Sequence, residues 1–428
     1  MTSPAGSPDT GRDTRPAATS AGTDRRRRGL ALARSLTVKV ALTYLVLRAV
    51  SALLLVLASR DQDVMLDWTG PTVEPIDMTV LWDGSWYRNV ALQGYPDPLP
   101  VDQTTGRVTQ NAWAFYPLFP LLARMLMAAT GLGFPVVAST LALVAGLGAS
   151  LLMARLLAEK VGDRVALGAV AVWAAFPASV SLQLAYTESL AMLVLCALLW
   201  ALVRRSWGMV AGLSLLLGLT RPIAVPVVLV VAVSVLLLWR RRRQQNVTRG
   251  ELLAALAALG TSAVGAVLWP LIAWQVTGSR SAYTDTMAAW RAGGEITPLK
   301  PWLGMSQWAF RDFDGAAVYG PVGLAALVTT IVVLTCGPWA TRLGPELRVW
   351  CLAYPAYLAF VLDPFTSIFR YALPLFPLLV VVLGGGWVDR VARHLAVRVG
   401  FLVVAGTVGQ AAWIWKLLVY HPPSDYPP

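Results

Sequence analysis

Residues 36–59 read LTVKVALTYLVLRAVSALLLVLAS and form the first long apolar run of the chain. As an α-helix this run would extend about 36 Å, enough to cross the roughly 30 Å hydrocarbon core of a bilayer. Arg48 lies inside it, and a charge at that depth is costly unless it faces the interior of a helix bundle. We therefore predict that residues 36–59 form the first of several membrane-spanning helices that pack against one another.

The rest of the chain has the same character. Of its 428 residues, 57% are hydrophobic and only 14% are charged, whereas soluble proteins carry about 25% charged residues. The pattern predicts an all-α polytopic membrane protein with about eleven crossings. Thr220-Arg221-Pro222 should break one long run, because proline disrupts a helix. The further spans are predicted at 134–157, 165–182, 188–203, 207–219, 222–239, 251–275, 318–337, 348–362, 371–388 and 399–419.

Basic residues dominate the net charge of +12, and they occur in short tracts between apolar runs, such as 25–28 and 240–243. Positive charge concentrates on the cytoplasmic side of membrane proteins, so these tracts require no nucleic-acid partner. Residues 1–28 are rich in Thr, Ser, Pro, Gly and Arg and predict a disordered cytoplasmic tail. We predict a multi-pass protein of the plasma membrane, with one transmembrane domain at 29–421 and a short outer tail at 422–428.

Two polar loops should lie outside the cell, at about 60–112 and 276–315. The first contains eight acidic and three basic residues, a composition untypical of a cytoplasmic loop. The segment 113–130 decides the topology between the two loops. If it crossed the membrane, Arg204, Arg205 and the tract 240–243 would face outward. We therefore predict a juxtamembrane or re-entrant helix there.

This topology collects several charged residues on the outer face, in gaps beside apolar runs where charge is costly unless it lines a cavity. Asp83 could be a helix cap or a solvated turn residue, or a general base that accepts a proton from a hydroxyl group. Arg221 and Arg370 could bind a phosphate, since guanidinium groups match its oxygens; the alternative for Arg370 is snorkelling at the interface. Glu188 could orient Arg221 or Tyr87, or bind a sugar hydroxyl.

Aromatic residues surround Asp83. In a helical turn, Trp82 and Trp86 would share one face, and Asp83 and Tyr87 the next. Such residues can belong to the aromatic belt of the membrane interface, or they can contact a sugar. The residues predicted to contact the sugar or the acceptor are Trp82, Trp86, Tyr87, Arg88, Tyr186 and Glu188. His394 and His421 are too few and too far apart to form a histidine metal site, so we predict no metal ligands; the sequence leaves a requirement for a divalent metal open.

Several short motifs occur in a fixed order. Trp82-Asp83-Gly84-Ser85-Trp86-Tyr87 is followed by Gly94-Tyr95 and by Phe115-Tyr116-Pro117-Leu118-Phe119-Pro120, and later by Tyr186-Thr187-Glu188-Ser189 and Thr220-Arg221. These motifs and their order resemble the PIG-V family of mannosyltransferases. The resemblance covers about a third of the chain. It departs from the family at Tyr116, where Phe is usual, and at Pro222.

The resemblance implies a GT-C glycosyltransferase fold with an active site on the outer face. It implies inverting transfer of mannose from a polyprenyl-phosphate donor, with Asp83 as the catalytic base and no cofactor other than this lipid-linked substrate. The composition, rich in Ala, Arg and Val, is typical of a high-GC bacterium. The expected acceptor is then a glycolipid, a lipoglycan or an exported protein.

Two other functions stay open on the sequence. A transporter or flippase of a lipid-linked sugar would explain Arg48, but such carriers often contain internal repeats, and the sequence has no convincing repeat. A non-catalytic scaffold could bind the same lipid for a partner enzyme. An enzyme would hydrolyse the donor or transfer its mannose in detergent, whereas a carrier would require alternating access. Loss of transfer in an Asp83→Asn protein that still binds the donor would argue against a scaffold.

Overall fold

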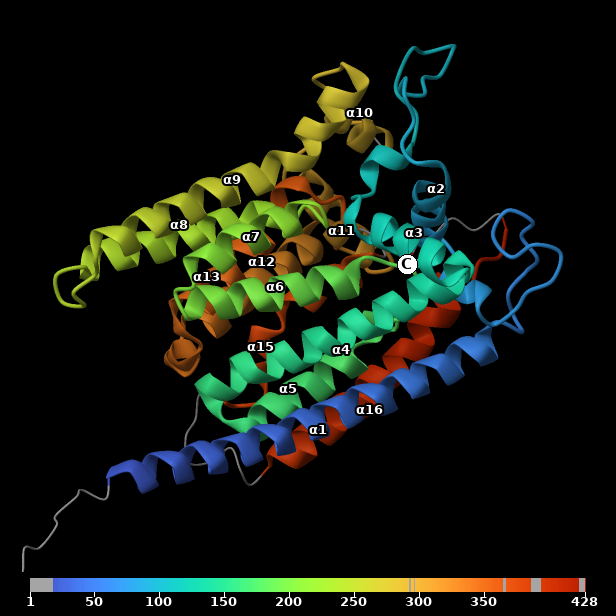
Figure 1. Cartoon of the computed structure of the whole chain (residues 1–428). Helices are drawn as coiled ribbons and strands as arrows, with labels where there is room; N and C mark the ends of the chain where they lie inside the picture. The colour runs from blue at the N-terminus through green and yellow to red at the C-terminus, as the bar shows by residue number, and fades with distance from the viewer. Residues whose placement is uncertain (1–17, 292–293, 296, 365–366, 386–393, 423–427) are drawn as a thin grey trace, which may run out of the picture.

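A computed structural model of the protein describes residues 18–291, 294–295, 297–364, 367–385, 394–422 and 428 (Figure 1). The described residues form helices joined by turns and loops, and their one β-type pairing is an isolated bridge between Val101 and Val108. It is an all-α polytopic membrane protein, as predicted. The main bundle contains α1 (Ala18–Ala58), α4 (Phe134–Val161), α5 (Asp163–Ala175), α6 (Glu188–Val203), α7 (Trp207–Gly218), α8 (Ala224–Arg241), α9 (Arg249–Thr277), α12 (Ala316–Cys336), α13 (Gly344–Val361) and α16 (Leu395–Trp413).

Shorter helices lie in the polar loops and between the long helices. The first loop contains α2 (Asp83–Gln93) and precedes α3 (Leu118–Thr130), and the second contains α10 (Ala282–Ala289) and α11 (Lys300–Ala309). The predicted span 371–388 consists of short pieces, including α15 (Pro377–Val382), and continues into residues outside the described part. It follows α14 (Ile368–Tyr371).

Among the described residues, five helices are long and apolar enough to cross a membrane on their own. They include the predicted first span and α4, α9 and α12, while the apolar helices α3, α6, α7 and α8 are shorter. The break predicted at Thr220-Arg221-Pro222 is confirmed, because α7 ends at Gly218 and α8 begins at Ala224. The predicted span 165–182 is similarly divided, since α5 ends before Pro177 and a 3₁₀ turn follows.

The helix α3 does not traverse the bundle. It has 13 residues and a length of about 20 Å. The backbone N–H of Leu118 donates to Leu219 at the end of α7, and α4 begins four residues after α3 ends. The α4 helix then returns past the start of α6, where Gly146 packs beside Ser189. Segment 113–130 is therefore a short helical excursion, as the distribution of arginines predicted.

Arg48 is 2% exposed and stabilises the break after α5. Its guanidinium donates to the carbonyl oxygens of Ala174 and Ser179, at the end of α5 and in the 3₁₀ turn after it. These carbonyls have lost their helical partners at the break, so the buried cation replaces missing hydrogen bonds. The ring of Tyr44, one turn earlier in α1, lies 5.6 Å from the Arg48 guanidinium.

Two groups of charged side chains, each with both signs, lie at opposite ends of the bundle. Arg204 at the end of α6 pairs with Glu159 near the end of α4, and Arg205 lies 3.9 Å from Glu251 at the start of α9. The arginine tract at the end of α8 belongs to the same end. Glu188, at the opposite terminus of α6, lies at the other end. The parity argument thus separated these two groups correctly; which end faces the cytoplasm stays a prediction.

The beginning of α1 differs from the sequence-based boundary. The helix starts at Ala18, so residues 18–28 are helical, although they were assigned to a disordered tail. Residues 1–17 lie outside the described part, as does most of the predicted outer tail at 422–428. The tail prediction therefore extended too far into the chain.

Candidate active site

Asp83 is the first residue of α2, and the backbone before it adopts a conformation that side chains rarely take. Trp82 has a φ of 56°, in the left-handed region. Its indole holds it there, because the Nε1–H donates to the carbonyl of Leu418 at 2.9 Å and the ring packs between Trp68 and Tyr420. The anchored Trp82 fixes the direction in which α2 begins, and with it the position of Asp83.

The chain after Asp83 packs tightly on the segment before α6. A Cβ atom on Gly84 would lie 3.1 Å from the carbonyl oxygen of Thr79 and 3.5 Å from the ring of Tyr186. The Tyr186 hydroxyl donates to the carbonyl of Leu81 at 3.0 Å, and the Ala185 N–H donates to Thr79 at 2.7 Å. The Tyr186-Thr187-Glu188 motif is therefore joined directly to the Trp-Asp-Gly motif, although about one hundred residues separate them.

Four charged side chains meet at this junction. Nη1 of Arg370 lies 2.6 Å from Oδ2 of Asp83 and 2.9 Å from Oε1 of Glu188. Nη1 of Arg221 lies 2.7 Å from the same oxygen of Glu188. The order is thus Asp83, Arg370, Glu188, Arg221, with each carboxylate next to a guanidinium. We call these four residues the charge cluster; its formal charge is zero.

Burial differs across the charge cluster in a way that separates its members. The side chains of Arg370 and Glu188 are each 4% exposed, Arg221 is 14% exposed and Asp83 is 28% exposed. Buried Glu188 links the two arginines, which favours orientation of Arg221 over contact with a sugar hydroxyl. Asp83 is the carboxylate that a molecule from outside could reach.

Both arginines stay charged. Burial alone would lower the pKa of each guanidinium, but the neighbouring carboxylates outweigh it. Glu188 raises the pKa of Arg221, and Asp83 together with Glu188 raises that of Arg370 well above its ordinary range. Aromatic faces add to this stabilisation, since Arg370 lies 5.1 Å from the ring of Tyr186 and Arg221 lies 5.2 Å from the ring of Tyr371.

A small pocket opens beside Glu188, Arg221 and Arg370. Two hydrogen-bond donors near it are buried without a partner among the described residues: the hydroxyl of Tyr354 and Nε of Arg370. Arg221 uses only Nη1 in an ion pair within the described part of the chain, so its other N–H groups can bind a ligand. The remaining wall is mostly apolar and includes Ala191, Met192, Ile223, Tyr371, Leu373 and Pro374. A pocket with surplus donors and cations suits an anion.

The aromatic residues near Asp83 divide into separate groups. Trp82 precedes α2, so its predicted shared face with Trp86 is wrong. Trp86 stacks on Phe115 with 5.5 Å between ring centroids and meets Trp290 edge-on at 5.1 Å. Tyr87 is buried against Phe115 and Phe119. Trp86 is half-buried, and so it is the more accessible of the two tryptophans.

Arg88 points away from the charge cluster. Its guanidinium donates to the backbone carbonyl of Asp67 in the first polar loop, which ties that loop to α2. The structure also adds residues that the sequence analysis missed, namely Tyr354, Tyr371 and Ser367, whose hydroxyl lies 3.4 Å from Nη2 of Arg370. Tyr371 follows Arg370 directly, and that adjacency was the only available signal. Within the described part of the chain, no three His, Cys, Asp or Glu side chains gather in a metal-binding arrangement.

Two solved structures of the oligosaccharyltransferase from Archaeoglobus fulgidus are similar to this chain. One is a complex with zinc and sulfate, and the other is tethered to an acceptor peptide that contains an NVT sequon. Both are 14% identical to this chain, with a TM-score of 0.41, over 86% and 87% of its length. The matches cover 53% and 55% of those structures, so the chain spans about half their length. No protein-family model and no curated protein matches the chain.

Proposed function

We propose that the protein is an inverting glycosyltransferase of the plasma membrane, which moves mannose from a polyprenyl-phosphate donor to a glycolipid, lipoglycan or protein acceptor on the outer face. The charge cluster carries this proposal, because it combines an accessible carboxylate with arginines beside a donor-rich pocket. The sequence resemblance to PIG-V mannosyltransferases supports the same chemistry and supplies the identity of the sugar and of its lipid carrier.

In this reaction an acceptor hydroxyl oxygen attacks the anomeric carbon of the donor from the face opposite the phosphate. The bond between that carbon and the phosphate oxygen breaks, and polyprenyl phosphate leaves with the bonding electrons. Asp83 takes the proton of the acceptor hydroxyl as the new glycosidic bond forms. Charge builds up on the leaving phosphate, and fixed cations stabilise it without reorganisation.

We assign the phosphate chiefly to Arg221, whose free N–H groups border the pocket. The start of α8 lies beside the same pocket through Ile223, and a helix N-terminus favours an anion. Arg370 serves mainly as a positioning residue, since its Nη1 is shared between Asp83 and Glu188. Trp86, rather than the packed Trp82, is the better candidate for contact with a sugar.

The test is mannosyl transfer by the purified full-length protein in detergent, with polyprenyl-phosphate mannose as donor and a membrane-lipid extract as acceptor. Asp83→Asn keeps the shape and an oxygen acceptor for Arg370 but cannot take a proton. It should lower turnover by about a hundredfold or more while donor binding persists. The matched control is Asp67→Asn, which removes an exposed carboxylate from the same loop.

Three outcomes separate the proposed function from its alternatives. Near-normal turnover in Asp83→Asn would remove Asp83 as the base. Donor binding without transfer in the unaltered protein would indicate a scaffold. Movement of the lipid-linked sugar across a sealed vesicle without glycosyl transfer would indicate a carrier.

A further inference from the structure

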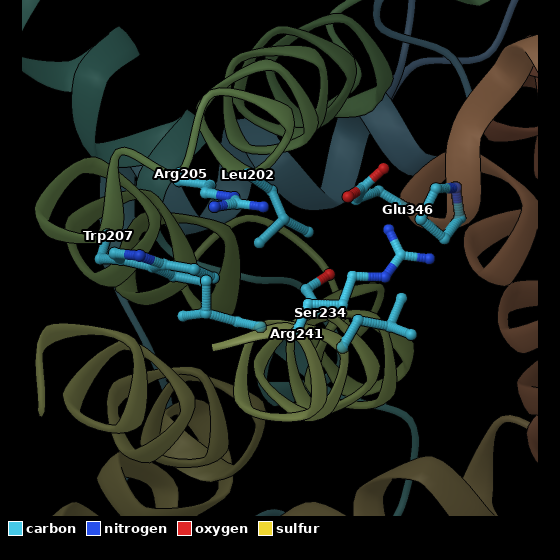
Figure 2. Close-up of a pocket in the computed structure, with 9 residues that line it drawn as sticks. Leu202, Arg205, Trp207, Ser234, Arg241 and Glu346 are labelled. Atoms are coloured by element: carbon cyan, nitrogen blue, oxygen red, sulfur yellow. The ribbon is translucent and has the colours of Figure 1, made fainter. Parts of the chain in front are cut away.

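A second pocket lies at the end of the bundle opposite the charge cluster (Figure 2). It is formed where α6 and α8 end and where α7 and α13 begin. The helix α6 has 16 residues, so this pocket is about 24 Å from Glu188 at the other terminus of that helix. The proposed transfer reaction does not use it, and its function can be tested independently.

Hydrogen-bond donors predominate in this pocket. Figure 2 shows Arg241 and Glu346 on one side, Trp207 on the other, and Arg205 reaching in between. Trp207 is 5% exposed, and its indole Nε1 is buried without a partner in the described part of the chain. An unmet buried donor costs about 1–3 kcal/mol, so a ligand that accepts its proton would bind favourably.

The guanidinium groups add positive charge to these donors. Arg241 forms no side-chain hydrogen bond or ion pair with another described residue. Arg205 donates a hydrogen bond to the amide oxygen of Gln245 at 2.5 Å through Nη2, and its Nη1 lies 3.9 Å from Glu251. Two guanidinium groups and the Glu346 carboxylate line the pocket, and Glu251 offsets part of the charge of Arg205 from beside it, so the positive charge is small. That charge matches a phosphodiester, which carries one negative charge, better than a doubly charged phosphate ion.

The backbone conformation of Arg205, just after the end of α6, indicates that its side chain has a function other than helix termination. The N–H of Ser206 donates to Ala201, and that of Arg205 donates to Leu202, which together form a Schellman motif. Arg205 occupies the left-handed position of this motif, with φ at 56°, where glycine is favoured. An arginine there costs conformational energy, so stability alone does not explain it.

The apolar part of the wall comes from Leu202, Leu237, Leu238 and Pro345. It lies where apolar helices end, at the depth of lipid headgroups in a membrane-spanning bundle. We propose that this pocket binds the phosphodiester headgroup of an anionic membrane phospholipid. Arg205 and Arg241 bind the phosphate, the indole N–H of Trp207 donates to a phosphate oxygen, and the leucines contact the glycerol and the upper acyl chain.

The experiment is a titration of the full-length protein in detergent with phosphatidylglycerol, with bound lipid counted by native mass spectrometry. Arg241→Gln and Arg205→Gly should each weaken binding about tenfold, because each removes a charge-assisted hydrogen bond. Trp207→Phe should weaken it by about threefold to tenfold. Arg243→Gln is the matched control, since it removes the same charge from the same surface but does not line the pocket, and it should change affinity less than twofold.

Arg205→Gly gives a readout that a merely structural role would not produce. The substitution relieves the left-handed strain, which offsets the loss of the exposed contacts with Gln245 and Glu251, so the apparent melting temperature should stay about constant while lipid binding falls. A lower melting temperature with normal lipid binding would overturn the proposal. So would an equal loss of affinity in Arg243→Gln, which would indicate diffuse attraction to the basic surface. Competition by inorganic phosphate as effective as that of phosphatidylglycerol would assign the pocket to free phosphate instead of lipid.

Discussion

Removing one charge from the charge cluster should destabilise the protein more than removing two opposite charges. Glu188→Gln leaves a net charge of +1 at the junction, Arg370→Gln leaves −1, and the double variant returns the cluster to neutrality. Both side chains are 4% exposed, so water cannot solvate the charge that remains. Loss of one partner of a buried ion pair costs about 3–5 kcal/mol.

The two single losses would sum to about 6–10 kcal/mol if they were independent. In the double variant the remaining charges belong to Asp83 and Arg221, which are 28% and 14% exposed and therefore partly solvated. Two glutamines can also hydrogen-bond to each other. We expect a total loss of about 2–3 kcal/mol, which is less than that of either single variant, so the coupling energy should be about 4–7 kcal/mol.

The assay is equilibrium unfolding of the four proteins in mixed micelles, analysed as a double-mutant cycle. Arg204 and Glu159 provide the matched control, because they form the same type of pair with 51% and 38% of their side chains exposed. Their coupling should be below about 1 kcal/mol. Additive losses at the buried pair, within about 0.5 kcal/mol, would refute the view that these charges stabilise one another.

Activity distinguishes stabilisation from positioning. The double variant should fold better than either single variant but remain impaired in transfer, because Asp83 has lost the guanidinium that lies 2.6 Å from it. If stability and turnover recovered together, Arg370 would have no positioning role.

Two further predictions concern packing and substrate contact. Gly265→Ala should lower the free energy of unfolding by about 2–3 kcal/mol, since its Cβ would lie 2.5 Å from a backbone oxygen of α7. In the same helix, a Cβ at Gly260 meets nothing within 4 Å, so Gly260→Ala should be neutral or stabilising. Thermal unfolding in detergent measures both variants, and equal effects would contradict the close contact of α7 and α9. Trp86→Ala should raise the KM for donor or acceptor. Trp82→Phe should lower stability by about 1 kcal/mol and leave KM unchanged, because it loses only the hydrogen bond to the carbonyl of Leu418. A raised KM in Trp82→Phe alone would reverse the two assignments.

Much of the helical architecture follows from local sequence. Apolar runs locate the helices, and Pro222 and Pro177 explain why two of them are divided. The distribution of arginines also identified α3 as a segment that does not cross, although its hydropathy resembles that of a span. Apolar runs and prolines act locally, and the distribution of arginines needs only a count along the chain. A single sequence is therefore enough to use all of them.

The geometry of the site depends on contacts between distant residues. Arg370 and Asp83 are 287 residues apart, and no local pattern indicates that they form an ion pair. The sequence predicts that both lie on the same face of the bundle, as the structure has them, but it assigns Arg370 to phosphate rather than to Asp83. The predicted position of Trp82 is wrong for a related reason. Helical periodicity places Trp82 on the same face as Trp86, but Trp82 is hydrogen-bonded to the distant Leu418 and α2 begins one residue later, at Asp83.

The positions of the charges favour an enzyme over a carrier. Arg48 was the residue that best suited a transporter, yet it is buried and bound to the carbonyls of Ala174 and Ser179, where it stabilises a broken helix. The charges that remain near a pocket lie at helix termini. Asp83 and Glu188 are the first residues of α2 and α6, where the helix dipole stabilises a carboxylate in place. A carrier must expose its polar groups alternately to both sides, whereas this cluster joins residues from four segments at one end of the bundle. Charges that hold one another in place at one end suit a group transfer there.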